Sequence, residues 1–476
     1  MTRADSKRSH LKLVPSLVNE SLYVGVDVGK LKHVAGFVST ALLQRYERFE
    51  GCPAFTFEQS REGYRALIER IRAYAPRESC YVLMEQTGHY HKALEQYLLE
   101  LDISVSIMHV QRRPTGMIKT DKRDALGLAN HLYNQLECGI QVADKLHLVR
   151  RALPPTEAAA QLKGLTRHRY ELIEESTRRK NKLTAICDEV FPELTTIFKN
   201  PNLQTALSLR EQFPTPQAIT AASMTALQSV RGNNRSLTDA KLVELQQLAA
   251  HSIGMKDASR LRGLVFEQGQ LISELRLIQK HLEELDDEIG QIVEHCREGK
   301  ILTSIPPIGP LQAAMIIATI GSIGNFESAA KLKSYFGWAP IREQTGITFD
   351  RTHLTQGGVR TMQKTMFLVT WTAIRTETEW AVLYHRLVPR LCHFDERTQA
   401  YRGKGKVFGH IAGRLITLIY ALLKKDYETH SHLAPGAKPP EPILYDPEIH
   451  KRHRHGQYQA LKVSNTPQSI VQSSGR

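Results

Sequence analysis

Residues 22–30 read Leu-Tyr-Val-Gly-Val-Asp-Val-Gly-Lys, and this stretch decides the fold that the sequence predicts. A short run of β-branched, aromatic and aliphatic residues bounded by a glycine is typical of a buried β-strand. Asp27 interrupts the apolar run. An ionised carboxylate on a buried strand is costly unless a cation or a set of hydrogen bonds compensates it. We therefore expect other parts of the chain to supply a partner for Asp27.

The segments that follow this strand predict an α/β domain. Two more strands are expected at residues 33–38 and 42–49, which would form an antiparallel run with the first. Helices and strands then alternate, at residues 62–74, 80–84, 90–101 and 103–108. This order favours a sheet that is covered by helices.

The middle of the chain is predicted to be helical. Asp121 can cap a helix, and after Pro154 and Pro155 a long helix is expected at residues 156–189. Beyond a less regular insertion at 192–254, residues 255–298 carry apolar side chains at three- and four-residue steps, which indicates a coiled-coil-like seam. This seam can pair with the earlier long helix or with a second copy of the chain, and the sequence does not choose between them.

The last part of the chain contains a short turn before a helix of small residues. Residues 305–310, Ile-Pro-Pro-Ile-Gly-Pro, resemble a helix-hairpin-helix turn, followed by a helix at 311–320. Such a turn can direct backbone N–H groups near Gly309 toward phosphate. Further helices are expected at residues 329–336, from about 359, and at 411–423.

Composition favours a soluble protein with a polyanionic partner. The 476 residues allow two or three domains, and 63 Lys and Arg against 49 Asp and Glu give a formal charge of +14. Excess positive charge attracts phosphate backbones by steering and by counterion release, although a solvated basic surface is the alternative. The six cysteines form no Cys-x-x-Cys pair, which argues against disulfides and structural zinc. With no signal peptide and no apolar run of membrane-spanning length, we expect a cytoplasmic protein without a membrane partner.

Four carboxylates are candidates for catalysis and for metal binding: Asp27, Glu85, Asp121 and Asp124. Asp121 and Asp124 lie three residues apart, on one side of a helix. Like charges crowded together repel and raise each other's pKa, a conflict that divalent cations remove. Mg²⁺ prefers carboxylate oxygen, and two ions roughly 3.5–4 Å apart can serve both the attacking and the leaving oxygen of a phosphodiester displacement. The alternative is that these acids are helix caps and turn residues.

Basic residues around these acids and on later helices are candidates for nucleic-acid binding. The helix at 156–189 would then be a basic rod along a nucleic-acid backbone, as opposed to a merely solvated face. The full set of candidates is Arg112, Arg113, Lys119, Lys122, Arg123, Arg178, Arg179, Lys180, Gly309, Lys331, Lys333 and Arg360.

Three blocks in order resemble a known family. Residues 24–30, Met84 to Gly88 and residues 119–125 resemble the motif blocks of DEDD transposases of the insertion sequence one-ten family, whose relatives include the Piv and MooV invertases. Residues 305–340, which end in Gly-Trp-Ala-Pro, resemble the family's C-terminal transposase domain. The polar and basic residues 1–20 are expected to form a flexible arm. The resemblance implies an α/β RuvC-like domain of the RNase H type at 21–150 and a helical coiled-coil region with an insertion at 151–298. It also implies a mainly α C-terminal domain at 299–385, and a basic extension at 386–476 completes the chain.

The resemblance also implies an activity. In the family the acids bind Mg²⁺, and a serine of the C-terminal domain attacks DNA and becomes linked to phosphate. Here Gln344-Thr345-Gly346 stands where the family has Ser-Gly, so Thr345 takes the place of the nucleophile. A threonine hydroxyl can act as a nucleophile, although its methyl group restricts rotation and crowds the attack. The expected partners are donor and target DNA, a structured guide RNA, and other copies of the chain in a dimer or tetramer.

Three other functions remain open from the sequence. The first is a RuvC-like nuclease that cuts branched DNA without strand transfer. The second is an actin-like ATPase, because Asp27-Val28-Gly29 begins like a phosphate loop. The third is a nucleic-acid-binding protein without catalysis.

Overall fold

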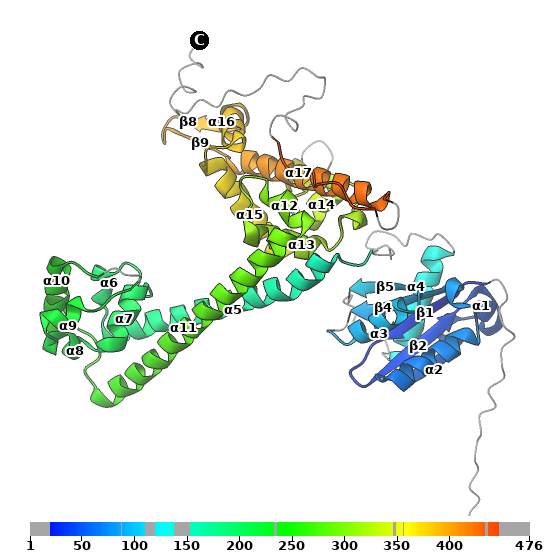
Figure 1. The fold of residues 1–476 in the computed structure, drawn as a ribbon, viewed down its shortest axis with the longest axis horizontal. Helices are drawn as coiled ribbons and strands as arrows, with labels where there is room; N and C mark the ends of the chain where they lie inside the picture. Colours follow the sequence, from blue (N-terminus) through cyan, green and yellow to red (C-terminus); the bar gives the residue numbers. More distant parts are fainter. Residues whose placement is uncertain are drawn as a thin grey trace, which may run out of the picture. The chain divides into compact units, whose positions relative to one another are not determined.

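The computed structural model describes residues 20–86, 88–109, 120–137, 153–232, 236–345, 349–355, 357–433 and 437–446. The chain divides into two compact units, residues 1–153 and 154–476 (Figure 1).

The first unit is built on a mixed five-stranded sheet with the strand order β3-β2-β1-β4-β5. Strands β1 (Leu22–Asp27), β2 (Lys32–Val38) and β3 (Ala54–Glu58) are antiparallel neighbours, whereas β4 (Cys80–Gln86) and β5 (Ser104–His109) run parallel to β1. The helices are α1 (Thr40–Tyr46), α2 (Arg61–Arg72), α3 (His91–Leu99) and α4 (Asp121–Leu136), with short 3-10 turns at Phe49–Gly51 and Arg77–Ser79. A sheet covered by helices is the α/β architecture that the sequence predicts.

The predicted strand at residues 42–49 is wrong. Residues 40–46 form helix α1, because the Ser39 side chain accepts a hydrogen bond from the Leu42 backbone N–H and caps the helix. Leu42 is buried and gives the helix one apolar side. The third strand is β3, which begins at Ala54.

The second unit contains two long helices that pack side by side. Helices α5 (Glu157–Val190) and α11 (Ala258–His295) run antiparallel, since Arg169 pairs with Asp286 while Arg179, farther along α5, pairs with the earlier Glu274. Between them in sequence lie α6 (Leu194–Ile197), α7 (Gln204–Gln212), α8 (Pro216–Ala221), α9 (Met224–Gln228) and α10 (Asp239–Ala250). In the described chain, the buried residues Leu271 and Leu275 of α11 join the core that Leu183 and Ile186 of α5 form. The apolar seam is therefore used within one chain.

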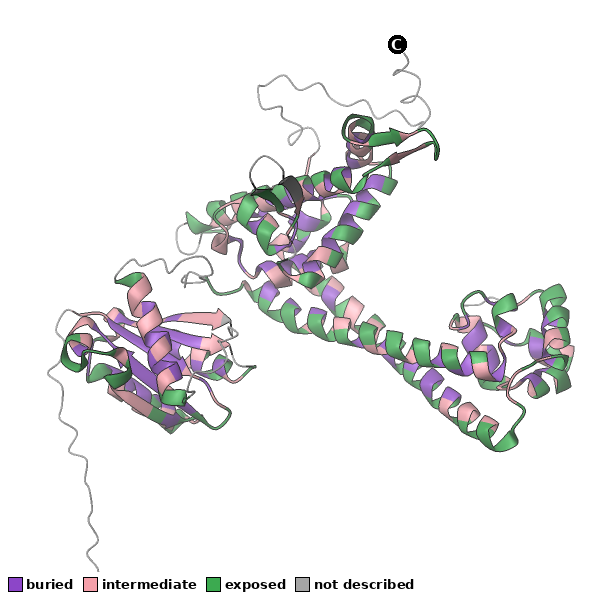
Figure 2. Ribbon diagram, turned by 180° about the vertical axis from the view of Figure 1, so that it is seen from behind, coloured by how far each residue is buried: buried purple, intermediate pink, exposed green. Residues whose placement is uncertain are grey.

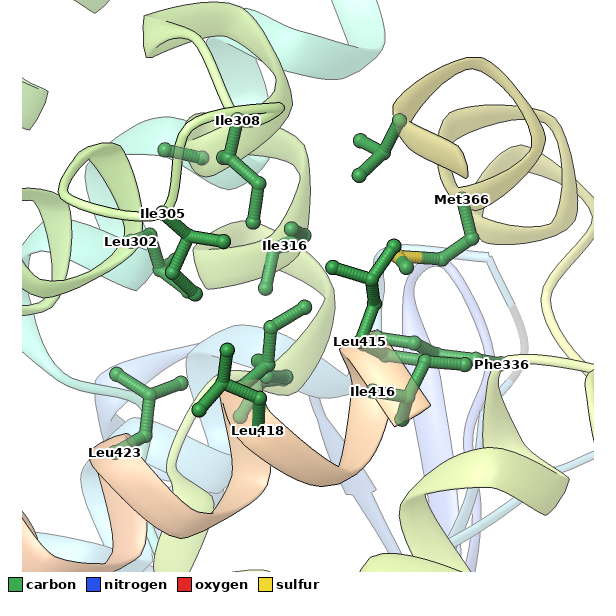
Figure 3. Packing of buried hydrophobic residues seen from close by; sticks show 14 of the residues in the cluster. Leu302, Ile305, Ile308, Ile316, Phe336, Met366, Leu415, Ile416, Leu418 and Leu423 are labelled. Atoms are coloured by element: carbon green, nitrogen blue, oxygen red, sulfur yellow. The ribbon is translucent and has the colours of Figure 1, made fainter. Parts of the chain in front are cut away.

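A second hydrophobic core lies at the other end of this helix pair (Figure 2). Around it pack α12 (Arg297–Thr303), α13 (Pro310–Ile320), the 3-10 turn Ile323–Asn325, α14 (Ala329–Tyr335), α15 (Arg360–Arg375), α16 (Glu379–Leu391) and α17 (Gly405–Ser431). Two hairpins complete this body: β6 (Pro340–Thr345) with β7 (Phe349–Leu354), and β8 (His393–Asp395) with β9 (Ala400–Arg402). In Figure 3, Ile316 of α13, Phe336 at the C-terminal end of α14, Met366 of α15 and Leu415 of α17 belong to this one core.

Helix α17 belongs to this core, although it lies in the segment that the sequence assigns to a basic extension. By length and composition it is apolar enough to cross a membrane. Its apolar residues Ile411, Leu415 and Ile419 are, however, fully buried against the other helices. These contacts account for its hydropathy as that of a core helix.

Candidate active site

The carboxylates Asp27 and Glu85 lie at the ends of two adjacent parallel strands. Val26 of β1 is in register with Met84 of β4, so Asp27 and Glu85 follow at the same level. Earlier on the same strands, the rings of Tyr23 and Tyr81 stack at 5.7 Å with an interplanar angle of 15°. Because side chains alternate between the faces of a sheet, residues four positions after this tyrosine pair share its face. Asp27 and Glu85 therefore lie on one face of the sheet.

Helix α4 covers that face and runs antiparallel to β1. Tyr23 contacts the C-terminal half of α4, where its hydroxyl donates to Glu137 at 2.6 Å and its ring meets Tyr133 edge-on. Gly25, two residues on, contacts the middle of the helix at Ala125 and Ala129. Two strand residues advance about 7 Å and four helix residues about 6 Å. The next position on this face, Asp27, therefore lies against the first turn of α4.

The first turn of α4 contributes Asp121 and Asp124. Thr120 is the N-cap, with its hydroxyl oxygen accepting from the Arg123 N–H at 3.2 Å, so the prediction that Asp121 caps this helix is wrong. Asp121 is exposed, while Asp124 is only 5% exposed. An acid at a helix N-terminus is favoured by the helix dipole. Burial of an ionised carboxylate is costly unless hydrogen bonds or an opposite charge compensate it.

The four acids fit Mg²⁺ in donor chemistry and in backbone placement. All supply carboxylate oxygen, the ligand type that Mg²⁺ prefers, and their backbones converge at one end of the sheet. As the side chains stand, no group of three or more His, Cys, Asp or Glu among the described residues is drawn together as a ligand set. These side chains would therefore have to rotate in order to hold an ion. Asp124 is already buried between α4 and the sheet.

Close packing of α4 on the sheet depends on two glycines. A Cβ at Gly25 would lie 2.1 Å from the carbonyl oxygen of Ala125 and 2.3 Å from the amide nitrogen of Ala129, and one at Gly36 would lie 2.7 Å from the Leu126 nitrogen. These neighbours are backbone atoms and cannot rotate away. The two glycines thus let the helix rest directly on β1 and β2, which fixes its first turn beside Asp27.

We expect Gly25→Ala to destabilise the first unit by roughly 3 kcal/mol, because the added methyl overpacks against helix backbone. Gly127→Ala, on the helix α4 that packs against Gly25, is the matched control, since a Cβ there meets no atom within 4 Å. Hydrogen exchange of β1 and α4 peptides in the full chain measures the effect. Equal protection in the two variants would contradict this account of the packing.

The loop after Asp27 is held by His33, which the sequence analysis missed. His33 is fully buried, and its Nδ1 accepts a hydrogen bond from the Gly29 N–H at 3.3 Å. Its Nε2 contacts Oε1 of Gln59, which also accepts from the Tyr64 hydroxyl at 2.8 Å. Burial lowers the pKa of His33. Because Nδ1 accepts from Gly29, a neutral ring here carries its proton on Nε2, toward Gln59. The only signal in the sequence is a histidine in an apolar strand.

Of the candidate basic residues near the acids, two lie among the described residues. Arg112, Arg113 and Lys119 lie outside the described residues. Lys122 is exposed on the first turn of α4, and Arg123 lies 3.6 Å from Glu50.

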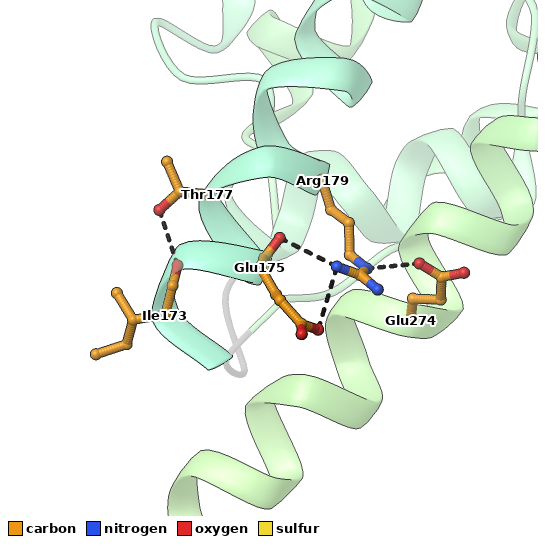
Figure 4. Close-up of polar contacts among 5 residues, drawn as sticks. All are labelled: Ile173, Glu175, Thr177, Arg179 and Glu274. Carbon is orange, nitrogen blue, oxygen red and sulfur yellow. Dashed lines mark hydrogen bonds and ion pairs between the residues drawn. The ribbon is translucent and has the colours of Figure 1, made fainter. Parts of the chain in front are cut away.

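The basic residues of α5 are not one uninterrupted rod. Arg179 lies between two carboxylates, 3.4 Å from Glu175 on its own helix and 2.6 Å from Glu274 on α11 (Figure 4). The charge of Arg179 is therefore neutralised within the α5–α11 pair. Arg178 and Lys180 are exposed and stay candidates for phosphate contacts. The free positive charge of α5 is therefore lower than its sequence alone predicts, because the acids of α11 lie far away in the chain.

In the C-terminal body, Gly309 is the N-cap of α13, and Pro310 follows at the first helical position without an N–H to offer. Lys331 and Arg360 are exposed, and desolvation lowers the pKa of the half-buried Lys333. Thr345 is the last residue of β6, opposite Phe349 of β7.

Comparison with known proteins identifies the family. A family model of DEDD transposases of the IS110 type matches residues 24–192. A second, described as Transposase IS116/IS110/IS902 family, matches residues 299–386. The chain belongs to the IS110 family of transposases.

Several relatives share much of the length of this IS110 family transposase. The insertion element IS110 uncharacterized 43.6 kDa protein of Streptomyces coelicolor is 23% identical over 68% of this chain and 75% of its own length. The IS116 44.8 kDa protein of Streptomyces clavuligerus is 24% identical over 49% of this chain and 59% of its own length. The pilin gene-inverting protein of Moraxella bovis is 21% identical over 85% of this chain and 96% of its own.

Family membership makes this protein a transposase, a DNA recombinase enzyme of the DEDD type. It favours recombination over the actin-like ATPase and over a binding protein without catalysis.

Proposed function

We propose that this transposase moves its own insertion sequence by a Mg²⁺-dependent recombination that a structured RNA of the element guides. In this proposal Asp27, Glu85, Asp121 and Asp124 hold two Mg²⁺ ions, and Thr345 supplies the hydroxyl nucleophile. The observation that carries it is the convergence of two strand-end acids with the acidic first turn of α4, within a family of DNA recombinases.

The residues of this chain would divide the chemistry between them. Bound Mg²⁺ would supply Lewis-acid stabilisation of the phosphate charge. The Thr345 hydroxyl loses its proton and attacks phosphorus, so that a threonine–phosphate bond forms, one phosphorus–oxygen bond of the DNA breaks and the released DNA oxygen takes up a proton. A DNA hydroxyl from another strand can then attack the same phosphorus and restore threonine. No external energy source is needed, because each step exchanges one phosphodiester for another.

The proposed partners are donor DNA, target DNA and the guide RNA, in the prokaryotic cytoplasm. The formal charge of +14 and the exposed Arg178 and Lys180 support polyanion binding. The α5–α11 seam is occupied within the chain, so it gives no support for oligomers. A dimer or tetramer is proposed because exchange between donor and target needs several cleavage sites.

The test is cleavage of element-end DNA by the purified full chain, with the RNA of the element's non-coding end. We expect cleavage in Mg²⁺ to fall at least about 100-fold in excess EDTA, since the acids would then lack their counter-ions. Addition of Mg²⁺ beyond the chelator should restore it. Omission of the RNA should abolish cleavage in Mg²⁺ as well. Undiminished cleavage in EDTA would contradict the metal assignment, and cleavage without RNA would contradict guidance.

A further inference from the structure

Helix α15 is apolar on both of its sides. One side, with Met362, Met366, Val369 and Ala373, is fully buried in the core. The opposite side exposes Phe367 (47%), Leu368 (55%) and Trp371 (45%). Single exposed apolar residues are ordinary, but three large ones on adjacent turns of one helix face indicate a binding surface. We call Phe367, Leu368 and Trp371 with the neighbouring Phe408 the aromatic face.

The rings of this face are held in a fixed row. Phe367 and Trp371 lie 6.2 Å apart with an interplanar angle of only 12°. Phe367 also lies 5.0 Å from Phe408, which in turn lies 6.0 Å from the buried Trp338. The exposed rings are therefore anchored to the core through Phe408. A preformed surface of this kind loses little conformational entropy when a flat partner stacks on it.

The charges that α15 itself carries beside the aromatic face are positive. Arg360, Lys364 and Arg375 lie on the exposed side of α15, and residues 360–376 include no Asp or Glu. Lys364 is already engaged, since it donates to the Tyr170 hydroxyl at 2.9 Å and has Glu174 of α5 nearby. The guanidinium of Arg375 lies 5.2 Å from the centre of the Trp371 ring. Residues 397–425, which include Phe408, also contain no acid. Charge complementarity thus selects a partner that is anionic and also presents flat apolar surfaces.

We propose that the aromatic face binds unpaired nucleotides, whose bases stack on Phe367 and Trp371 while their phosphates contact Arg360 and Arg375. The inference rests on the proposed function only in that the protein acts on nucleic acid. Bases in a duplex are already stacked and cannot offer their faces, so the partner is single-stranded or a loop. A second copy of this face is disfavoured as the partner, because a symmetric contact would bring the same positive charges together.

The aromatic face adjoins the hairpin that carries Thr345. Trp338 lies two residues before β6, and Leu354 at the end of β7 packs over Gly409, next to Phe408. Strand β6 has six residues, so Thr345 lies within about 20 Å of the base of the hairpin. A strand held on this face therefore has its continuation within reach of the proposed nucleophile.

The test is binding of a fluorescein-labelled oligothymidine of about 20 nucleotides to the full chain in EDTA, measured by anisotropy. The double variant Phe367→Ala/Trp371→Ala should weaken binding about 10- to 100-fold, the range expected for the loss of base stacking. The variant Phe266→Ala removes an aromatic ring that is 68% exposed on α11 and should leave binding unchanged. Phe367→Tyr/Trp371→Phe keeps the rings and should retain affinity.

Two further measurements separate stacking from simple charge attraction. An oligonucleotide of the same length with abasic sites should bind the wild type and the double variant equally, and thymidine bases should quench the fluorescence of Trp371. Equal affinity of both proteins for oligothymidine would overturn the proposal. If, in addition, the wild type self-associates and the double variant does not, the aromatic face is a contact between copies of the chain. Asp27→Asn should bind oligothymidine as tightly as the wild type, because binding is measured in EDTA. The result therefore tests the aromatic face independently of the metal assignment.

Discussion

Asp27→Asn is expected to abolish recombination, with a loss of at least about 10³-fold in cells that carry the element's two ends and its non-coding RNA. The change replaces one carboxylate oxygen by an amide and keeps the size of the side chain. Asp27 ends β1 beside Glu85 and faces the first turn of α4, so its charge would be part of the ligand set for Mg²⁺. Without that charge, the remaining acids bind the ion more weakly.

Stability measurements give this prediction a second readout. A ligand that binds only the folded state raises the free energy of unfolding, so Mg²⁺ should raise the melting temperature of the wild type and not that of Asp27→Asn. Without Mg²⁺ the variant should be at least as stable as the wild type, because repulsion among the acids is reduced. Asp102→Asn is the matched control, since Asp102 is exposed in the same unit and its φ of 59° suits asparagine. Normal recombination by Asp27→Asn would remove Asp27 from the metal site.

Thr345→Ala is expected to abolish strand joining, with a loss of at least about 100-fold, while Thr345→Ser should match or exceed the wild type. Alanine removes the hydroxyl, whereas serine keeps it without the methyl that restricts rotation. The measurement is a covalent protein–DNA adduct on a denaturing gel, together with recombinants in cells. The adduct should be absent from Thr345→Ala.

Thr417→Ala serves as the control, because Thr417 is exposed on α17 of the same body and its hydroxyl only donates to the Gly413 carbonyl. If Thr345→Ala still cuts DNA at the wild-type rate without an adduct in either protein, the RuvC-like nuclease without strand transfer is the better description.

Strand β1 and helix α4 were predictable because their apolar periodicities are strong and local. The strand expected at residues 42–49 failed, since a short apolar run such as Leu42-Leu43 suits either structure, and the Ser39 cap decided for a helix. The predicted start of α4 was also displaced by one residue, since the N-cap is Thr120 and not Asp121. Local pattern thus identifies the elements better than their ends.

Features that depend on distant partners were not predictable from one sequence. One of the two acids that pair with Arg179, Glu274, lies 95 positions away on α11, so the free positive charge of α5 was overestimated. The role of His33 depends on Gln59 across the sheet. The exposed rings of Phe367 and Trp371 have the same helical spacing as core residues, and only the packing of α15 shows which side is covered.

The antiparallel pair α5–α11 joins two hydrophobic cores that lie at its opposite ends. With 34 residues, α5 spans about 50 Å. The pair therefore acts as a ruler within the second unit: its length, and not the loops around it, sets how far apart the two cores stand. A partner that contacts the surfaces over both cores at once would have to span about that distance.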